Sequence, residues 1–116
     1  MPLSLVGSEM CIRDRYPEFM AQDAAEYFDE FNMLWSDESP IEAKEGRLVA
    51  IAVSAAIRCE YCIAAQIEFA KKVGATDDEI KAAIQIAAEI QRFSTLLYGN
   101  EFDVETFNKI IGRNNK

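Results

Sequence analysis

Histidine is absent from this chain of 116 residues, and cysteine is scarce, with three residues in all. A structural zinc site needs about four ligands, which are drawn mainly from cysteine and histidine. Because the chain cannot supply that set by itself, we expect no metal site. We also expect no bound cofactor.

Long apolar runs and basic clusters are missing as well. Half of the residues are apolar, yet no stretch approaches the roughly 20 consecutive apolar residues that cross a bilayer. The 20 acidic and 12 basic residues give a net charge of -8, with the basic ones scattered, which disfavours nucleic acid and anionic membranes as partners. An odd, small number of cysteines argues against a secreted disulfide framework, so we expect a cytoplasmic protein.

The N-terminal stretch MPLSLVGSEMCIRDR has neither the basic start nor the apolar run of a secretory signal. Its part SLVGSEMCIRDR resembles a translated sequencing-adapter tail. We therefore expect residues 1–15 to be a non-native or flexible tail, and Cys11 to have no functional role. Residues 16–116 are expected to form a single domain.

From residue 17 onward the apolar residues recur at steps of three and four, as on a helix with one buried face. No strand-like alternation occurs. The predicted fold class is all-α, a compact bundle of about five to six helices. The helices are expected over about residues 17–35, 40–55, 59–73, 76–98 and 104–111.

Several residues indicate where these helices begin and end. Pro17 and Pro40 suit the first turns of the first two helices, and Gly74 suits the end of the third. The sequence TDDE, residues 76–79, is typical of a capping box at the start of the fourth helix. Asp103 can cap the last helix.

The apolar faces of the last two helices are expected to be buried. In the fourth helix this face begins at Ile80 and continues through Ile90 and Phe93. In the last helix it consists of Phe107, Ile110 and Ile111.

The stretch IRCEYCIAAQ holds Cys59 and Cys62 three positions apart at the predicted start of the third helix. The two sulfurs then share one face, within reach of a disulfide and near backbone amides that favour a thiolate. Such a pair can attack a peroxide or an oxidised sulfur and then close into a disulfide. The alternative is that both cysteines are small buried core residues. A thioredoxin fold is excluded, since it needs a strand before this motif.

Residues 48–88 contain a helix rich in small residues, then the C-x-x-C pair, then VGATDDEI. This order resembles the core of the carboxymuconolactone decarboxylase superfamily, in particular its alkylhydroperoxidase D-like branch. The resemblance implies an all-helical subunit that assembles into homo-trimers or hexamers and reduces small hydroperoxides with electrons from a thiol/disulfide donor protein. It further implies that Cys62 is the attacking cysteine and Cys59 the resolving one, whereas helix-end electrostatics alone favour Cys59 as the attacking cysteine.

The chain departs from the family at two positions of the site. Family members carry a histidine four residues after the second cysteine and a glutamate twelve residues before the first, where this chain has Gln66 and Arg47. Neither an amide nor a guanidinium can act as a general base. Glu45 and Glu60 could replace the relay only with an unexpected geometry, because their spacing directs them elsewhere.

Arg47 and Gln66 could instead stabilise a thiolate by charge and by a donated hydrogen bond, or they could be an ordinary pair on a helix surface. The sequence therefore favours a slow thiol-dependent hydroperoxide reductase. A protein dithiol–disulfide oxidoreductase or redox sensor is the alternative, and a non-catalytic helical oligomeric module is a third. Lactone decarboxylation fits less well, because the decarboxylases of this superfamily rely on histidine.

Overall fold

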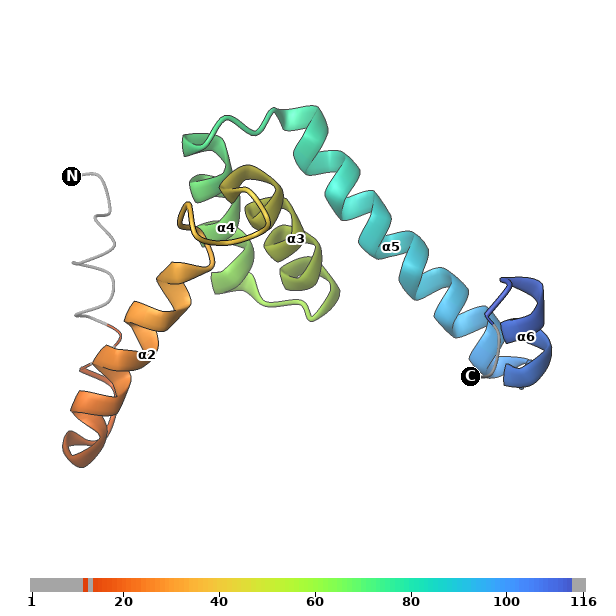
Figure 1. Ribbon diagram of the computed structural model, residues 1–116, viewed down its shortest axis with the longest axis horizontal. Coiled ribbons are helices and arrows are strands. Elements are labelled where there is room, and N and C mark those ends of the chain that lie inside the picture. Colours follow the sequence, from red (N-terminus) through yellow and green to blue (C-terminus); the bar gives the residue numbers. More distant parts are fainter. Residues whose placement is uncertain (1–11, 13, 114–116) are drawn as a thin grey trace. The chain divides into compact units, whose positions relative to one another are not determined.

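The computed structural model describes residue 12 and residues 14–113. Within these residues it contains helices and no strand, which confirms the predicted all-α fold class. None of the described helices is both long and apolar enough to cross a bilayer. The elements are the 3₁₀ turn η1 (Glu18–Met20) and the α-helices α2 (Ala21–Met33), α3 (Ala43–Ala56), α4 (Glu60–Lys72), α5 (Asp77–Gly99) and α6 (Val104–Ile110). Figure 1 labels these α-helices.

The chain divides into two compact units, with the boundary between Gly46 and Arg47 in the first turns of α3. The first unit holds η1 and α2, and the second holds most of α3 together with α4, α5 and α6. The single domain expected over residues 16–116 remains a prediction. Most of the expected tail, residues 1–15, lies outside the described residues.

The first unit is organised by aromatic side chains. The rings of Tyr27 and Phe28, and those of Phe31 and Trp35, meet edge to face with centroids 5.6 Å apart in each pair. A Cβ atom on Gly46 would lie 3.2 Å from Cζ3 of Trp35. The missing side chain of Gly46 therefore lets the indole approach the helix closely.

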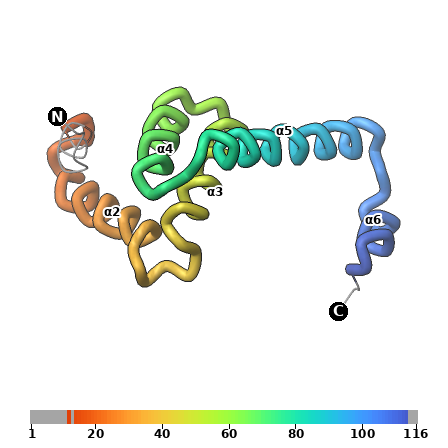
Figure 2. The backbone as a smooth tube through the Cα atoms, turned by 90° about the horizontal axis from the view of Figure 1, so that it is seen from above, coloured from red at the N-terminus to blue at the C-terminus, as the bar shows by residue number. Residues whose placement is uncertain are grey.

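The core of the second unit lies where α3, α4 and the start of α5 pack side by side (Figures 1 and 2). Ile51 and Ala70 are fully buried there, next to Ala75 and Ile80. Leu48, Ile63 and Ile67 pack around them.

The second half of α5 is exposed, contrary to the expected burial of its whole apolar face. Ile80 and Ala83 are buried, but Ile90 and Phe93 are 65% and 56% exposed. At 1.5 Å per residue, the 14 residues of α3 reach about 21 Å, whereas the 23 residues of α5 reach about 34 Å. The two shorter helices therefore leave the far end of α5 uncovered.

The expected burial in α6 is wrong for the same reason. Phe107, Ile110 and Ile111 are all exposed, since α6 follows the end of α5 that lies beyond the core. The ring of Phe107 makes one edge-to-face contact with Phe102, at a centroid distance of 6.4 Å.

Most of the predicted helix ends agree with the structure. The capping box is present: Glu79 N–H donates to Thr76 Oγ1 across 3.1 Å, and Thr76 N–H donates to Glu79 Oε1 across 2.9 Å. Gly74 ends α4 with a φ of +93°, and Asp103 caps α6. The expected start at Pro40 is wrong, because α3 begins at Ala43, after a turn in which Ser39 Oγ accepts from Ile41 N–H.

Candidate functional site

The cysteines of the C-x-x-C motif form a disulfide at the start of α4, with their Cα atoms 5.2 Å apart. Cys59 is the N-cap residue, and its sulfur accepts a hydrogen bond from the backbone N–H of Cys62 across 3.1 Å. The predicted position of the pair at the beginning of a helix is therefore confirmed. At an N-cap the sulfur lies next to the positive end of the helix, which favours negative charge on it.

The end of α3 holds the backbone of Cys59 in place. Cys59 N–H donates to the carbonyl of Ser54 across 3.0 Å, and Arg58 N–H donates to that of Ala55 across 3.2 Å. This is the hydrogen-bond pattern of a Schellman motif, which needs a left-handed residue after the helix. Arg58 takes that conformation, with a φ of +58°, although glycine is the usual residue there. Cys59 thus joins two helices, ending the cap of α3 and starting α4.

The disulfide is half-buried and has exposed neighbours. Neither Cys59 nor Cys62 belongs to the buried core. Ile57, two residues before the pair, and Tyr61, between the two cysteines, are 66% and 87% exposed. Glu60 is also exposed, so it turns outward as expected. These exposures disfavour the alternative in which the cysteines are sealed core residues.

Arg47 and Gln66, the two positions at which the chain departs from the family that its sequence resembles, are brought together from α3 and α4. Arg47 Nη1 donates to Gln66 Oε1 across 2.9 Å, and the two residues are 5% and 9% exposed. The alternative of an ordinary pair on a helix surface is therefore wrong. The guanidinium also lies over the ring of Phe69, with Cζ 4.8 Å from its centroid. Burial lowers the pKa of Arg47 to about 10, which leaves it cationic at neutral pH.

The spacing along α4 relates this pair to the disulfide. Gln66 follows Cys62 by four residues in one continuous helix, so the two share a face. Glu45 and Glu60 are both exposed, and neither belongs to the buried pair. The buried groups on this face, an amide and a guanidinium, can donate hydrogen bonds but cannot take up a proton near neutral pH.

Two polar side chains that the sequence did not single out support the end of α3. Ser54 Oγ donates to the carbonyl of Ala50 across 2.6 Å. Gln91, on α5, donates through Nε2 to the carbonyl of Ala56 across 3.1 Å. In the sequence, Gln91 lies at helical spacing from Ile80 and Ala83, which places it on the same face of the helix. That spacing is the sequence feature that points to this contact.

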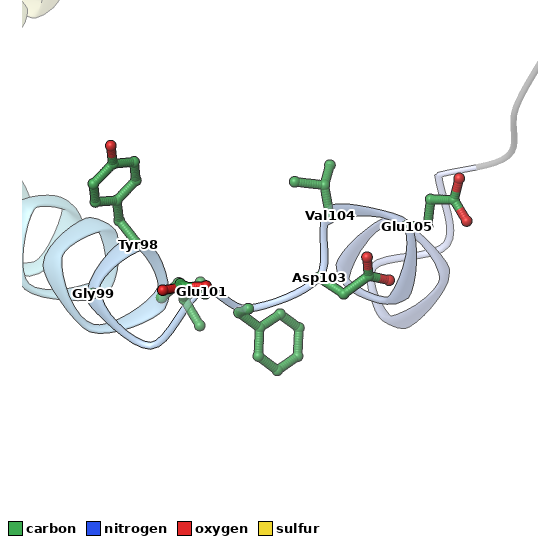
Figure 3. Close-up of a pocket in the computed structure, with 8 residues that line it drawn as sticks. Tyr98, Gly99, Glu101, Asp103, Val104 and Glu105 are labelled. Carbon is green, nitrogen blue, oxygen red and sulfur yellow. The ribbon is translucent and has the colours of Figure 1, made fainter.

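A separate hollow lies at the turn between α5 and α6 (Figure 3). Its lining includes the carboxylates of Glu101, Asp103 and Glu105. The carboxylate of Asp103 is the N-cap of α6 and accepts a hydrogen bond from the backbone N–H of Thr106. Neither cysteine of the disulfide lines this hollow, so it is not the site that the sequence predicts.

The fold and the site define a class of protein: its described residues form helices, with a C-x-x-C disulfide at the start of one helix and a buried arginine–glutamine pair whose glutamine lies one turn further along that helix. A model of the carboxymuconolactone decarboxylase family matches residues 22–101, well over half of the chain. The protein therefore belongs to the carboxymuconolactone decarboxylase family.

A relative from Paracoccus denitrificans, named "Uncharacterized protein 4 in cox locus", is 28% identical over 64 residues. The match covers 55% of this chain and 58% of the relative, so the chain spans little more than half of that relative's length. No solved structure matches the chain significantly.

Proposed function

We propose that the protein is a thiol-dependent hydroperoxide reductase of the alkylhydroperoxidase D-like type, which cycles Cys59 and Cys62 between dithiol and disulfide. The observation that carries the proposal is the half-buried disulfide at the N-terminus of α4. Family membership agrees with a redox role for this motif. The substrate is a small hydroperoxide, and the electrons come from a thiol/disulfide donor protein of the same reducing, cytoplasmic compartment.

The proposed cycle uses both cysteines. The Cys62 thiolate attacks one oxygen of the hydroperoxide, the O–O bond breaks, and the departing alkoxide takes a proton from solvent to become an alcohol. The sulfur is then a sulfenic acid. Cys59 attacks that sulfur and forms the disulfide, while the hydroxide leaves with the Cys59 proton as water. Two thiols of the donor reduce the disulfide and become a disulfide themselves.

The rate of peroxide reduction is expected to be low for this family. General-base help is typically worth about 10² to 10⁴ in rate. Arg47 and Gln66 cannot give that help, because neither side chain accepts a proton near neutral pH. The thiols must therefore lose their protons to solvent.

The buried Arg47–Gln66 pair favours a second function, protein dithiol–disulfide exchange or redox sensing. Exchange needs a stable thiolate, and a buried guanidinium with an amide suits that need better than it suits proton transfer. Lactone decarboxylation is not proposed, because a chain without histidine lacks the residue on which that reaction relies.

Stopped-flow oxidation of the reduced protein by an organic hydroperoxide tests the proposal. Cys62→Ser is expected to abolish peroxide consumption, and Cys59→Ser to stop the cycle at the sulfenic acid. Cys11→Ser is the matched control and should consume peroxide at the unchanged rate. If both C-x-x-C variants also consume peroxide at the unchanged rate, the reductase proposal is wrong.

Two further measurements separate the alternatives. A chain that is inert to peroxide but exchanges with a protein disulfide at a measurable rate is an oxidoreductase or sensor. A chain whose two thiols both resist alkylation in the folded state is a helical assembly module without redox activity.

We also propose that the chain forms a homo-oligomer, a trimer or hexamer. Apolar side chains are exposed at four-residue steps along α3 and just past its end, at Val49, Val53 and Ile57, and again on α5 at Ile90 and Phe93. Exposed apolar faces of this kind are usually covered by another copy in a small homo-oligomeric subunit. Sedimentation that finds only monomer at micromolar concentration contradicts this assembly.

A further inference from the structure

The buried guanidinium of Arg47 is fixed in place by two neighbouring side chains. Arg47 is held on two sides, by its 2.9 Å hydrogen bond to Gln66 Oε1 and by the face of the Phe69 ring. A planar guanidinium fixed by an amide and an aromatic face is a preorganised cation. Its position is therefore set before any chemistry occurs at the cysteines.

The hydrogen bond also determines which end of the Gln66 amide faces Arg47. Arginine has five N–H donors and no acceptor, so only the carboxamide oxygen can face it. With the oxygen held by Arg47 Nη1, the Nε2 group is directed away from the guanidinium. The outward end of this amide is consequently a hydrogen-bond donor.

The geometry of α4 gives that donor a direction. Gln66 lies one turn after Cys62, and residues four apart on a helix have Cβ atoms about 5–6 Å from each other. Helical side chains lean toward the N-terminus of their helix. The Gln66 side chain therefore leans toward the turn that carries the Cys62 sulfur.

We propose that Arg47 is a positioning residue that orients the Gln66 carboxamide, so that its Nε2 group donates to the Cys62 thiolate of the reduced protein. The fixed cation and the donor stabilise the thiolate together. This inference rests on the proposed dithiol–disulfide cycle, and it adds how the chain keeps Cys62 ionised without a proton acceptor.

Other charges are poorly placed to have this effect. Arg58 and Glu60, next to the cysteines in sequence, are exposed, so water screens them. The buried residues of α4 and α5 carry no charge. They are Gln66 and Ala70 in α4, and Ile80 and Ala83 in α5. Among the buried residues of α3, α4 and α5, Arg47 supplies the charge.

Stabilising the thiolate changes the redox balance as well. The dithiol holds two electrons more than the disulfide, so any interaction with the thiolate favours the reduced form. The Arg47–Gln66 pair is therefore expected to raise the reduction potential of the Cys59–Cys62 couple. A couple of higher potential takes electrons more readily from its donor.

The central test measures the ionisation of Cys62 in a Cys59→Ser background, from the pH dependence of alkylation by iodoacetamide. Arg47→Met is expected to raise the thiol pKa by about one unit and slow alkylation at pH 7 by up to about tenfold. Arg47→Lys keeps the charge and is expected to recover part of the loss. Arg92→Met, at an exposed arginine that pairs with Glu89, removes the same charge and should leave the rate within about twofold.

A double-variant cycle tests whether Arg47 acts through Gln66. Gln66→Met removes the donor at similar volume. The double variant Arg47→Met with Gln66→Met should raise the Cys62 pKa by less than the sum of the two single increases. Strict additivity overturns the positioning role. A lower melting temperature with an unchanged Cys62 pKa also overturns it, since the pair would then be only structural.

Two measurements do not depend on peroxide, and the first of them needs no substitution at Arg47 or Gln66. In the Cys59→Ser chain, the Gln66 side-chain NH₂ resonances are expected to shift with the midpoint of Cys62 ionisation, and resonances that do not move overturn the proposal. Against glutathione, Arg47→Met in the full dithiol chain should lower the potential by up to about 30 mV, which corresponds to tenfold in the equilibrium constant. If the protein shows these shifts but does not consume peroxide, the reductase proposal is wrong and the positioning role of Arg47 stands.

Discussion

The sulfur of Cys59 accepts the backbone N–H of Cys62 across 3.1 Å while the two residues are joined by a disulfide. When the disulfide opens, a Cys59 thiolate keeps this donor and the positive end of α4. The sulfur with the more stable thiolate is the better leaving group in exchange. The Arg47–Gln66 pair acts in the opposite sense on Cys62, but the helix end acts on Cys59 through a direct hydrogen bond to its sulfur and is expected to be the larger effect. Cys59 is therefore expected to leave, and Cys62 to be attacked.

This relationship predicts where a mixed disulfide forms. When the oxidised protein reacts with a limiting amount of glutathione, a glutathione thiolate should attack Cys62, and Cys59 should leave as the thiolate. Acid quenching, alkylation and peptide mapping are expected to find glutathione mainly on Cys62. Glutathione mainly on Cys59 would show that access, and not the leaving group, decides the reaction.

Restoring the family's relay is expected to accelerate peroxide reduction. The double variant Arg47→Glu with Gln66→His replaces a charged donor pair by a histidine and a carboxylate that can move a proton. The rate should rise by about 10², with a new inflection near pH 6.5 where histidine titrates. Gln66→His alone is the control and should gain less, because no carboxylate then orients the ring. An unchanged rate in the double variant contradicts the argument that a missing base limits the reaction.

Two glycine substitutions should change stability in opposite directions. Alanine is favoured over glycine in a helix by about 0.5–1 kcal/mol. A Cβ on Gly99 meets nothing within 4 Å, and Gly99 is the last residue of α5, so Gly99→Ala is expected to stabilise the protein by up to that amount. In Gly46→Ala the new Cβ would lie 3.2 Å from the Trp35 ring, and the strain should outweigh the gain. The melting temperatures of both variants test this prediction. Equal shifts of the same sign would contradict it.

Arg58→Gly is expected to stabilise the junction between α3 and α4. Arg58 has a φ of +58°, and a left-handed conformation costs a residue with a side chain about 1–2 kcal/mol. Part of this gain is lost because glycine makes the unfolded chain more flexible. We expect a net gain of about 0.5–1 kcal/mol in the free energy of unfolding, measured in denaturant. Arg58→Ala keeps the strain and is the control, so an equal gain there refutes the explanation.

The start of α6 is expected to weaken in acid. Hydrogen bonds from the Thr106 hydroxyl and then its backbone N–H lower the pKa of Asp103 below its ordinary value. Because the folded pKa is the lower one, the stabilisation is complete above the ordinary pKa of about 4 and is lost as the pH falls through the lowered value. The Thr106 amide resonance should follow this titration, and in Asp103→Asn, which caps without titrating, it should not. A Thr106 resonance that is constant across this range contradicts the cap's role.

Local features of this fold could be predicted from sequence, because each depends on residues a few positions apart. The capping box of Thr76 and Glu79 is of this kind, as is the left-handed Gly74. The left-handed conformation of Arg58 could not be predicted, since an arginine carries no signal for it. The start of α3 was missed because Pro40 suits a turn as well as a first helical residue.

The amino-acid sequence by itself determined that the chain is helical and that Cys59 and Cys62 meet at the first turn of α4. Helix periodicity and a spacing of three residues suffice for both. Only the tertiary structure decided that Arg47 reaches Gln66, 19 residues away, and that both are buried. It also decided that the far half of α5 is exposed. These outcomes depend on how one helix packs against another and on how far each extends, and such long-range contacts leave no periodic pattern within a single segment.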